Sequence, residues 1–294
     1  MAIVIDGKIV ADKIKADLEL KTKELLANKG IKPGLALLLV GENAASQVYV
    51  NMKAKTCQKI GFHSIIERLP SDTTEKQILE LIKSWNNSDL VHGILVQLPL
   101  PKHIDEQKVI ECINPNKDVD GFHPINVGKM LIGLPALLPC TPAGIMELFK
   151  FYNISLAGKN AVVLGRSNIV GKPIASLMLQ KGKHANATVT ICHSGTPNLA
   201  EYTKRADILV VAMGSPEFIK ADMVKEGAII IDVGTNRVDE PIGDKAYRLC
   251  GDVDYADVFE KVAAISPSPG GVGPMTIAML MQNTYNVAAG KYDK

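Results

Sequence analysis

Short apolar runs recur along this chain, and longer segments with helical spacing separate them. The run Leu35–Gly41 (LALLLVG) is apolar throughout, which is typical of a parallel strand that is buried on both faces. Thr74–Trp85 instead repeats its apolar residues every three or four positions, as a helix does. The alternation of strands and helices predicts an α/β fold. The other predicted strands are Phe62–Leu69, Gly93–Leu98, Ala161–Gly165, Ala187–Cys192, Ile208–Met213 and Ala228–Val233.

This alternation falls into two blocks, and 294 residues are enough for two domains. The second block begins near Thr141, which is followed by a proline suited to the first position of a helix. We therefore predict two α/β domains, residues 1–139 and 140–273. A last helix, Pro274–Ala289, follows a crossing rich in glycine and proline. We expect this helix to pack back on the first domain, so that residues 274–294 complete it.

Composition excludes several classes of protein. Apolar residues make up 47% and charged residues 22%, which is a globular balance. A net charge of +2 without a Lys/Arg tract argues against a nucleic-acid partner. We predict no signal peptide and no transmembrane helix, and therefore no membrane partner. The five cysteines form no CxxC pair and no zinc spacing, so we expect reduced thiols, no metal site and a cytoplasmic location.

A glycine-containing loop, Gly165–Gly171 (GRSNIVG), joins a predicted strand to a predicted helix, where a Rossmann phosphate loop belongs. Gly165 would allow a sharp exit from the strand, and Gly171 would allow the helix to pack closely on it. The helix start would offer free N–H groups to a pyrophosphate. Ser167 replaces the usual middle glycine. Two interpretations stay open on this loop alone, a dinucleotide site and an ordinary strand-to-helix turn.

The end of the next strand favours NADP over NAD. NAD-specific sites usually carry an acid there for the ribose hydroxyls. Here the strand continues as His193-Ser194-Gly195-Thr196, without an acid. Arg166 in the preceding loop and the hydroxyl of Ser194 suit a 2′-phosphate. We assign no chemical role to His193.

The first block holds a second group of polar residues. Tyr49 and Lys53 are four residues apart, so they share a face of one predicted helix. Gln97 lies in an apolar strand, where it needs a buried partner or a ligand. Asp118 and Asp120 occupy one predicted loop. The alternative for Tyr49 and Lys53 is a solvated helix face, and the alternative for the two aspartates is a capped loop. Neither alternative explains Gln97.

Several segments match one known family in the family's own order. They are Tyr49–Lys53 (YxxxK), Val96–Pro101 (VQLPLP), Lys117–Phe122 (KDVDGF), Pro139–Pro142 (PCTP), Gly165–Pro173 (GRSNIVGKP) and Pro269–Thr276 (PGGVGPMT). Through them the chain resembles the methylenetetrahydrofolate dehydrogenase/cyclohydrolase family over nearly its whole length. It departs from the family's usual pattern at Ser268, where an apolar residue is more common, and at Thr235, where several relatives carry Ile.

The resemblance implies two α/β domains, a folate-binding catalytic domain and a C-terminal Rossmann domain that binds NADP, with NAD as the alternative. It implies oxidation of 5,10-methylenetetrahydrofolate to the 5,10-methenyl cation, followed by hydrolysis to 10-formyltetrahydrofolate. These reactions supply one-carbon units for the biosynthesis of purines and amino acids. It also implies a homodimer. A cleft between the domains is the expected place for the hydride transfer.

The resemblance also assigns roles to residues. Next to a cationic substrate an ammonium is disfavoured, so Lys53 is expected to exchange protons during hydrolysis. Tyr49 and Gln97 would orient it, and Asp120 would accept hydrogen bonds from the pterin ring. The substrate-binding residues implied are Tyr49, Lys53, Gln97, Leu98, Asp120, Gly273 and Pro274. The cofactor-binding residues implied are Gly165, Arg166, Ser167, Gly171, Ser194 and Thr235.

Three other functions compete with this one. A monofunctional methylenetetrahydrofolate dehydrogenase would lack hydrolysis, but Lys53 argues against it because relatives without hydrolysis depart at that lysine. An unrelated two-domain dehydrogenase, such as one for amino acids, fits the Rossmann half but not KDVDGF or VQLPLP. A non-enzymatic dinucleotide-binding regulator would not need Lys53, Gln97 and Asp120 together.

Overall fold

A computed structural model of the chain describes residues 2–240 and 247–292. It divides into two compact units. The six-stranded unit contains Met1–Ala11 and Thr141–Thr276, and the three-stranded unit contains Asp12–Cys140 and Ile277–Lys294. The two divisions of the chain at residues 11 and 276 fall inside helices α1 (Gly7–Lys29) and α10 (Val272–Ala288). Met1 and residues 293–294, which the predicted domain bounds include, lie outside the described residues.

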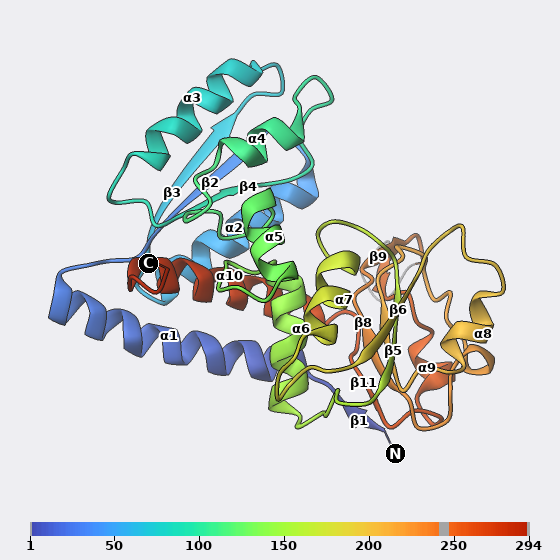
Figure 1. Cartoon of the computed structure of the whole chain (residues 1–294). Helices are drawn as coiled ribbons and strands as arrows, with labels where there is room; N and C mark the ends of the chain where they lie inside the picture. Colours follow the sequence, from blue (N-terminus) through green and yellow to red (C-terminus); the bar gives the residue numbers. More distant parts are fainter. Residues whose placement is uncertain (1, 241–246, 293–294) are drawn as a thin grey trace. The chain divides into compact units, whose positions relative to one another are not determined.

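The three-stranded unit is built on a parallel sheet with the order β3-β2-β4. The central strand β2 (Gly34–Val40) is buried along its whole length, as its apolar run predicts. On one face of the sheet lies a core to which α3 and α4 contribute, and α2 lies on the other face (Figure 1). The bounds are β3 (His63–Leu69), β4 (Gly93–Val96), α2 (Ala44–Lys59), α3 (Glu75–Asn86), α4 (Glu106–Cys112) and α5 (Pro124–Leu131).

Local capping explains where the helices of this unit begin. The side chain of Asn43 accepts a hydrogen bond from the Ser46 amide at the start of α2, as expected. Thr74 and Gln77 form a reciprocal capping box at the start of α3. Asn283 on α10 donates to the carbonyls of Val119 and Leu138 in the same unit. The predicted packing of the last helix on the N-terminal part of the chain is thereby confirmed.

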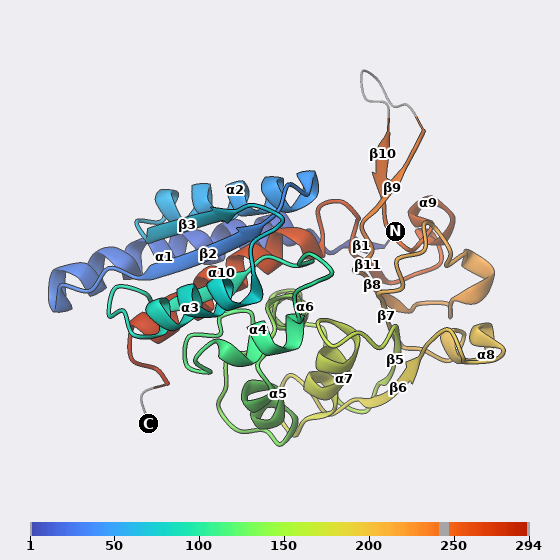
Figure 2. The same ribbon diagram turned by 90° about the horizontal axis from the view of Figure 1, so that it is seen from above.

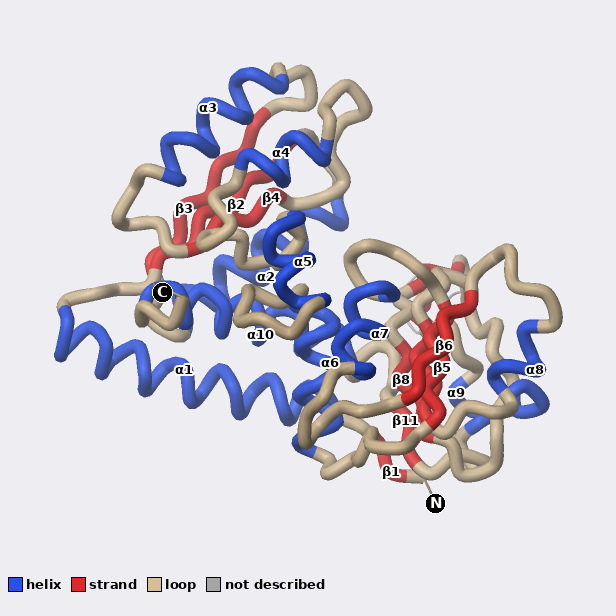
Figure 3. Tube along the Cα trace, viewed as in Figure 1, coloured by secondary structure: helices blue, strands red, loops and turns tan. Residues whose placement is uncertain are grey.

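The six-stranded unit is a parallel sheet with the order β1-β11-β8-β7-β5-β6. Figure 2 labels its strands in this order, and Figure 3 colours strands red. Chain order reverses at β5, whose neighbours are β6 on one side and β7 on the other, as in a Rossmann-type sheet. The bounds are β1 (Ile3–Val4), β5 (Asn160–Leu164), β6 (Thr188–Cys192), β7 (Ile208–Val211), β8 (Ile229–Asp232) and β11 (Ala264–Ile265).

Helices pack on this sheet, and a hairpin extends from it. The antiparallel pair β9 (Asn236–Val238) and β10 (Arg248–Cys250) forms that hairpin (Figure 2). The remaining elements are α6 (Cys140–Phe151), α7 (Gly171–Leu179), α8 (Leu199–Thr203), the short 3₁₀ helix η1 (Ala221–Met223) and α9 (Tyr255–Val258). Among the described residues, no helix combines the length and the apolar character that crossing a bilayer requires.

Several sequence-based boundaries differ from the structure. The strand predicted over Gly93–Leu98 ends at Val96, so Gln97 lies just after β4 and not within it. The first eleven residues belong to the six-stranded unit and not to the N-terminal domain, because β1 pairs with β11. Helix α6 begins at Cys140, one residue before Thr141, near which the second block was predicted to begin. Helix α7 begins at Gly171, the last residue of the predicted loop, because residues 168–170 form a turn ahead of it.

Candidate active site

Lys53 and Gln97 form a direct pair inside the three-stranded unit. Lys53 lies on α2 and is 8% exposed. Its Nζ donates a hydrogen bond of 2.9 Å to Oε1 of Gln97, which directly follows β4. The amide Nε2 of Gln97 donates to the carbonyl of Leu98 at 2.9 Å, so the Gln97 oxygen is turned toward the lysine. The prediction that Gln97 needs a partner is confirmed, and half-buried Leu98 helps to hold it.

Tyr49 lies one turn before Lys53 on the same helix, as its spacing predicts. Its side chain is 46% exposed, whereas Lys53 is buried. The shared face therefore offers a deep ammonium beside an accessible aromatic ring.

The two aspartates of the predicted loop differ in their surroundings. Asp118 is 2% exposed and accepts hydrogen bonds from the His123 amide at 2.8 Å and from Asn126 Nδ2 at 2.9 Å. These bonds match the capped-loop alternative for Asp118. Asp120 is only half-buried. Burial raises the pKa of its carboxyl group to about 6, while the charge of Lys53 acts in the opposite direction.

Two residues that the sequence reasoning missed hold the main chain beside Asp120. The carbonyl of Val119 accepts a bond from the Cys140 thiol at 3.2 Å and one from Asn283 Nδ2 at 2.9 Å. The Cys140 thiol also lies close to the Asp120 carboxyl group and counteracts the rise in its pKa. Asn283 is a buried amide in an apolar helix, so the argument made for Gln97 applies to it equally.

Gly273 and Pro274, expected at the substrate, form the first turn of α10 and belong to the six-stranded unit. A Cβ atom added to Gly273 would meet only open space. The glycine therefore leaves its main chain open to close approach.

A cavity of about 550 Å³ lies where chain order reverses in the six-stranded sheet. In parallel sheets, ligands bind outside the carboxyl ends of the strands at this position. The cavity is formed by the residues that end or follow β5, β6 and β7. They are Leu164, Gly165, Arg166, Ser167, Cys192, His193, Ser194, Thr196, Leu199, Ala212, Met213, Ser215 and Phe218.

The loop after β5 has the geometry that its glycines predict. Gly165 has a φ of +113°, and a Cβ atom there would lie 2.2 Å from the carbonyl oxygen of Ala212. A Cβ atom on Gly171 would lie 2.2 Å from the carbonyl oxygen of Gly165. Ser167 accepts hydrogen bonds from the amides of Val170 and Gly171 at 3.1 and 3.3 Å. Its hydroxyl therefore occupies two amides that were expected to be free for a phosphate.

The residues proposed for the 2′-phosphate lie at this cavity. Arg166 and Ser194 both line it and are exposed. Arg166 has no ion-pair partner among the described residues. Among the described residues, no Asp or Glu lines the cavity. Thr235 is exposed ahead of β9 and is not among the lining residues.

Sequence reasoning did not find the wall of the cavity that follows β7, although the rule of strand ends applies to it as well. Met213, Ser215 and Phe218 come from this segment. His193, which was given no role, accepts a bond from the Gly195 amide within the turn after β6 and also lines the cavity.

The departure at Ser268 has a local explanation. Its hydroxyl donates a hydrogen bond to the carbonyl of Gly234, the residue before Thr235. An apolar residue could not make this bond, so the serine ties the crossing before α10 to the segment after β8. No group of three or more His, Cys, Asp or Glu residues suited to a metal ion occurs in the described part of the chain.

Comparison with known proteins agrees with both units. Residues 5–120 match the family described as tetrahydrofolate dehydrogenase/cyclohydrolase, catalytic domain, and residues 139–292 match its NAD(P)-binding domain. The bifunctional protein FolD of Chlorobium chlorochromatii (strain CaD3) is 56% identical over 284 residues, which cover 96% of each chain.

Two solved structures extend this similarity to the fold. The bifunctional FolD of Campylobacter jejuni has a TM-score of 0.93 at 48% identity, covering 99% of this chain and 100% of that one. The Trypanosoma brucei enzyme, solved with NADP cofactor and an inhibitor, has a TM-score of 0.93 at 38% identity, covering 100% and 99%. The chain therefore belongs to the tetrahydrofolate dehydrogenase/cyclohydrolase family.

Proposed function

We propose that this protein oxidises 5,10-methylenetetrahydrofolate with NADP⁺ to the 5,10-methenyl cation and then hydrolyses the cation to 10-formyltetrahydrofolate. The observation that carries this proposal is the buried Lys53–Gln97 pair with the carboxylate of Asp120 in its electrostatic range. The bifunctional names of the relatives support both activities. The three-stranded unit would be the folate-binding catalytic domain, and the six-stranded unit would bind NADP.

Hydrolysis requires proton transfer as water adds to the electrophilic methenyl carbon. Water forms the new C–O bond and loses one proton. The resulting hydroxyl group loses its own proton as the C–N bond to ring nitrogen N5 breaks and the formyl C=O forms, and N5 gains a proton, so one proton is released overall. Lys53 is the group proposed to move these protons. It is buried, its Nζ donates a hydrogen bond to Gln97, and Tyr49 lies one helical turn away. Gln97 keeps the ammonium in place through its own bond to Leu98.

Asp120 is proposed to hold the pterin ring. An ionised carboxylate accepts two N–H bonds from the aminopyrimidinone edge, and bonds to a charged acceptor are the strong ones. Its exposure leaves it available for a ligand, whereas Asp118 is engaged with His123 and Asn126. Gly273, which leaves its main chain open, and Pro274 are also proposed substrate contacts.

NADP⁺ accepts the hydride in the first reaction when it is bound. The cavity at the sheet reversal fits this cofactor, because it combines the exposed guanidinium of Arg166 with hydroxyl groups, and no acid of the described residues lines it. Arg166 and Ser194 are proposed to bind the 2′-phosphate, while Gly165, Ser167 and Gly171 shape the loop beside it. Thr235 remains a proposed contact, and NAD⁺ is the weaker alternative.

The wider context is part of the same proposal. The protein would act in the cytoplasm as a homodimer and would supply one-carbon units for the biosynthesis of purines and amino acids. Size-exclusion chromatography with light scattering would test the dimer.

The function is tested by incubating the protein with 5,10-methylenetetrahydrofolate and either NADP⁺ or NAD⁺. We expect faster reduction of NADP⁺, a methenyl absorbance that appears and decays, and a 10-formyl product. A methenyl product that persists would instead indicate the monofunctional dehydrogenase. Absence of nucleotide reduction with both cofactors would contradict the proposed oxidation.

A further inference from the structure

The cavity wall that follows β7 has no regular secondary structure. Ala212, Met213, Ser215 and Phe218 line the cavity from this wall segment, residues 212–218. A segment without a helix or strand needs other hydrogen bonds to keep one shape. Residues that do not line the cavity provide these hydrogen bonds, and they therefore hold the wall segment in place.

Asp252 supplies most of them. Its side chain is fully buried, does not line the cavity and accepts bonds from three consecutive main-chain amides. Oδ2 accepts from Met213 at 2.6 Å and from Gly214 at 2.9 Å, and Oδ1 accepts from Ser215 at 2.9 Å. One carboxylate thus fixes the first half of the wall segment, and bonds to an ionised acceptor are about twice as strong as neutral ones.

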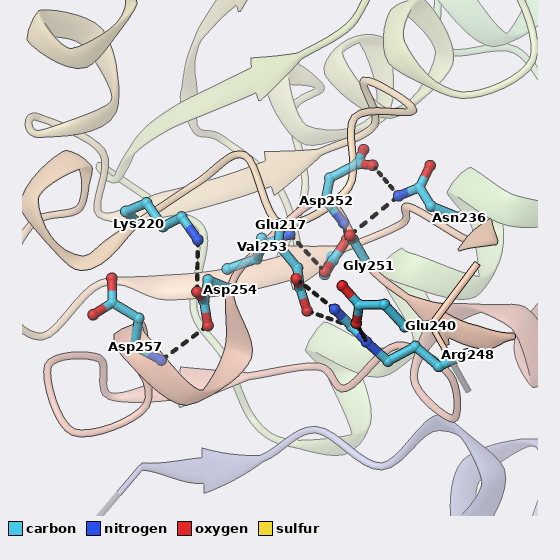
Figure 4. Close-up of polar contacts among 11 residues, drawn as sticks. Glu217, Lys220, Asn236, Glu240, Arg248, Gly251, Asp252, Val253, Asp254 and Asp257 are labelled. Carbon is cyan, nitrogen blue, oxygen red and sulfur yellow. Dashed lines mark hydrogen bonds and ion pairs between the residues drawn. The ribbon is translucent and has the colours of Figure 1, made fainter. Parts of the chain in front are cut away.

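The residues around Asp252 hold the second half. The Glu217 amide donates to the Gly251 carbonyl at 3.0 Å, and the Ile219 amide donates to the Asp252 carbonyl at 3.0 Å. The Glu217 carboxylate accepts two bonds from Arg248 on β10, at 2.6 and 2.9 Å (Figure 4). Residues of the segment Arg248–Asp252 therefore bond to both halves of the wall segment.

Asp252 is itself held firmly. Asn236 Nδ2 donates to its Oδ1 at 2.8 Å, which Figure 4 shows beside the bond to Gly251. The Asp252 amide donates to Oδ1 of Asp232, which also accepts the Gly234 amide at 2.9 Å. The carboxylate that shapes the wall thus has little freedom to move away from it.

We propose that Asp252, assisted by the Arg248–Glu217 pair, is a positioning residue for cofactor binding. It holds the wall segment in the shape that the cofactor meets, so binding does not have to order this segment. Ordering a mobile loop opposes association, which is why a preformed wall raises affinity. This inference rests on the proposed function of the six-stranded unit as the NADP-binding domain.

Asp252→Asn is the test. Asparagine keeps the size but offers one acceptor oxygen, and its NH₂ group faces an amide that needs an acceptor. The KM for NADP⁺ should rise roughly tenfold or more, because several bonds to a charged acceptor are weakened. The kcat at saturating NADP⁺ and the hydrolysis of added methenyltetrahydrofolate without nucleotide should stay near wild type.

Asp207→Asn is the matched control. Asp207 accepts the Asn160 amide at 2.9 Å and pairs with Lys225, but it precedes β7 and lies away from the wall segment. Its loss should leave the KM for NADP⁺ unchanged. An equal rise in KM in both variants would mean that Asp252 acts only through general stability, and the proposal would be wrong.

Glu217→Gln gives a second test if Asp252→Asn does not fold. This change weakens the Arg248 pair at the surface, and we expect the KM for NADP⁺ to rise by about two- to fivefold. NADP⁺ titration of the wild type tests the proposed function separately from the positioning role of Asp252. If the wild type does not bind NADP⁺, the proposed function fails. If it binds, but both folded variants bind equally well, only the positioning role of Asp252 fails.

Discussion

The two candidate sites differ in which chemical groups form them, side chains in one and main-chain turns in the other. In the three-stranded unit, the side chains of Lys53, Gln97 and Asp120 form the site directly. In the six-stranded unit, main-chain turns shape the cavity, and the buried carboxylate of Asp252 holds one wall from outside. A single substitution in the three-stranded unit should therefore abolish hydrolysis. A single substitution at the cavity of the six-stranded unit should instead weaken cofactor binding only in part.

The largest effect is expected for Lys53→Met on the hydrolysis of added methenyltetrahydrofolate. The substitution keeps the length and most of the packing of the side chain but removes the amine that Gln97 holds. The rate should fall by roughly 10²- to 10⁴-fold, the usual value of a positioned acid–base group. Lys55→Met changes an exposed lysine of the same helix and should have little effect. Hydrolysis by Lys53→Met at the wild-type rate would remove Lys53 from the mechanism.

Asp120→Ala should weaken folate binding by about 1.5–3 kcal/mol, the range for a hydrogen bond to a charged group. Titration with a folate analogue measures this loss, and NADP⁺ binding should be unchanged. Asp118→Asn sharpens the comparison, because Asp118 is engaged inside the loop. It should lower the melting temperature and leave the folate affinity of the folded protein intact. Equal folate affinity in wild type and Asp120→Ala would make Asp120 a loop residue as well.

Arg166→Ala should raise the KM for NADP⁺ by about tenfold while changing the KM for NAD⁺ little, since only NADP⁺ carries the 2′-phosphate. Steady-state kinetics with both nucleotides gives the two values. Arg205→Ala, an exposed arginine of the same unit, is the control and should change neither. Equal effects of Arg166→Ala on both nucleotides would contradict its proposed role.

An effect of about the same size is expected for the pH dependence of folate binding through Asp120. Its pKa of about 6 means that the carboxylate gains a proton as the pH falls through 6. At pH 5 about a tenth remains ionised, so affinity should be roughly tenfold lower than at pH 8. Asp120→Asn should abolish this pH dependence. A wild-type affinity that is constant from pH 8 to 5 would contradict the assignment.

The raised pKa of Asp120 also makes the folded protein more stable at low pH, whereas it weakens folate binding there. The pKa of Asp120 is higher in the folded protein than the ordinary value of 3.8, and that of buried Asp232 is raised to about 7. Their contributions to stability are present below about pH 4 and are lost as pH rises through these folded values. Unfolding followed across pH 4 to 8 should therefore show a smaller slope in Asp120→Asn.

Much of the frame could be predicted because its signals are local. The buried strand β2 is marked by its own apolar run, and helix α3 by the three- and four-residue spacing of its apolar residues. Gln97 was identified because an amide in an apolar strand needs a partner, and Lys53 is that partner. The Rossmann loop followed from Gly165 and Gly171, whose added Cβ atoms would meet main chain.

The parts that sequence reasoning missed depend on distant pairings. Strand β1 has two residues and exists through β11, far away in the chain, so no local pattern marks it. Asp252 looks like an ordinary acidic residue until the fold brings the amides of residues 213–215 to it. Choosing Asp120 over Asp118 likewise needed the resemblance, because the loop alone does not reveal which carboxylate the fold engages.

The central claim is that Lys53 is required for hydrolysis but not for hydride transfer, and one experiment tests it directly. The Lys53→Met variant is mixed with 5,10-methylenetetrahydrofolate and NADP⁺, and NADPH and methenyl absorbance are recorded together. The account predicts that both rise in equal amounts and that methenyl then decays only at its uncatalysed rate. Failure to form NADPH, or methenyl decay as fast as in the wild type, would contradict it.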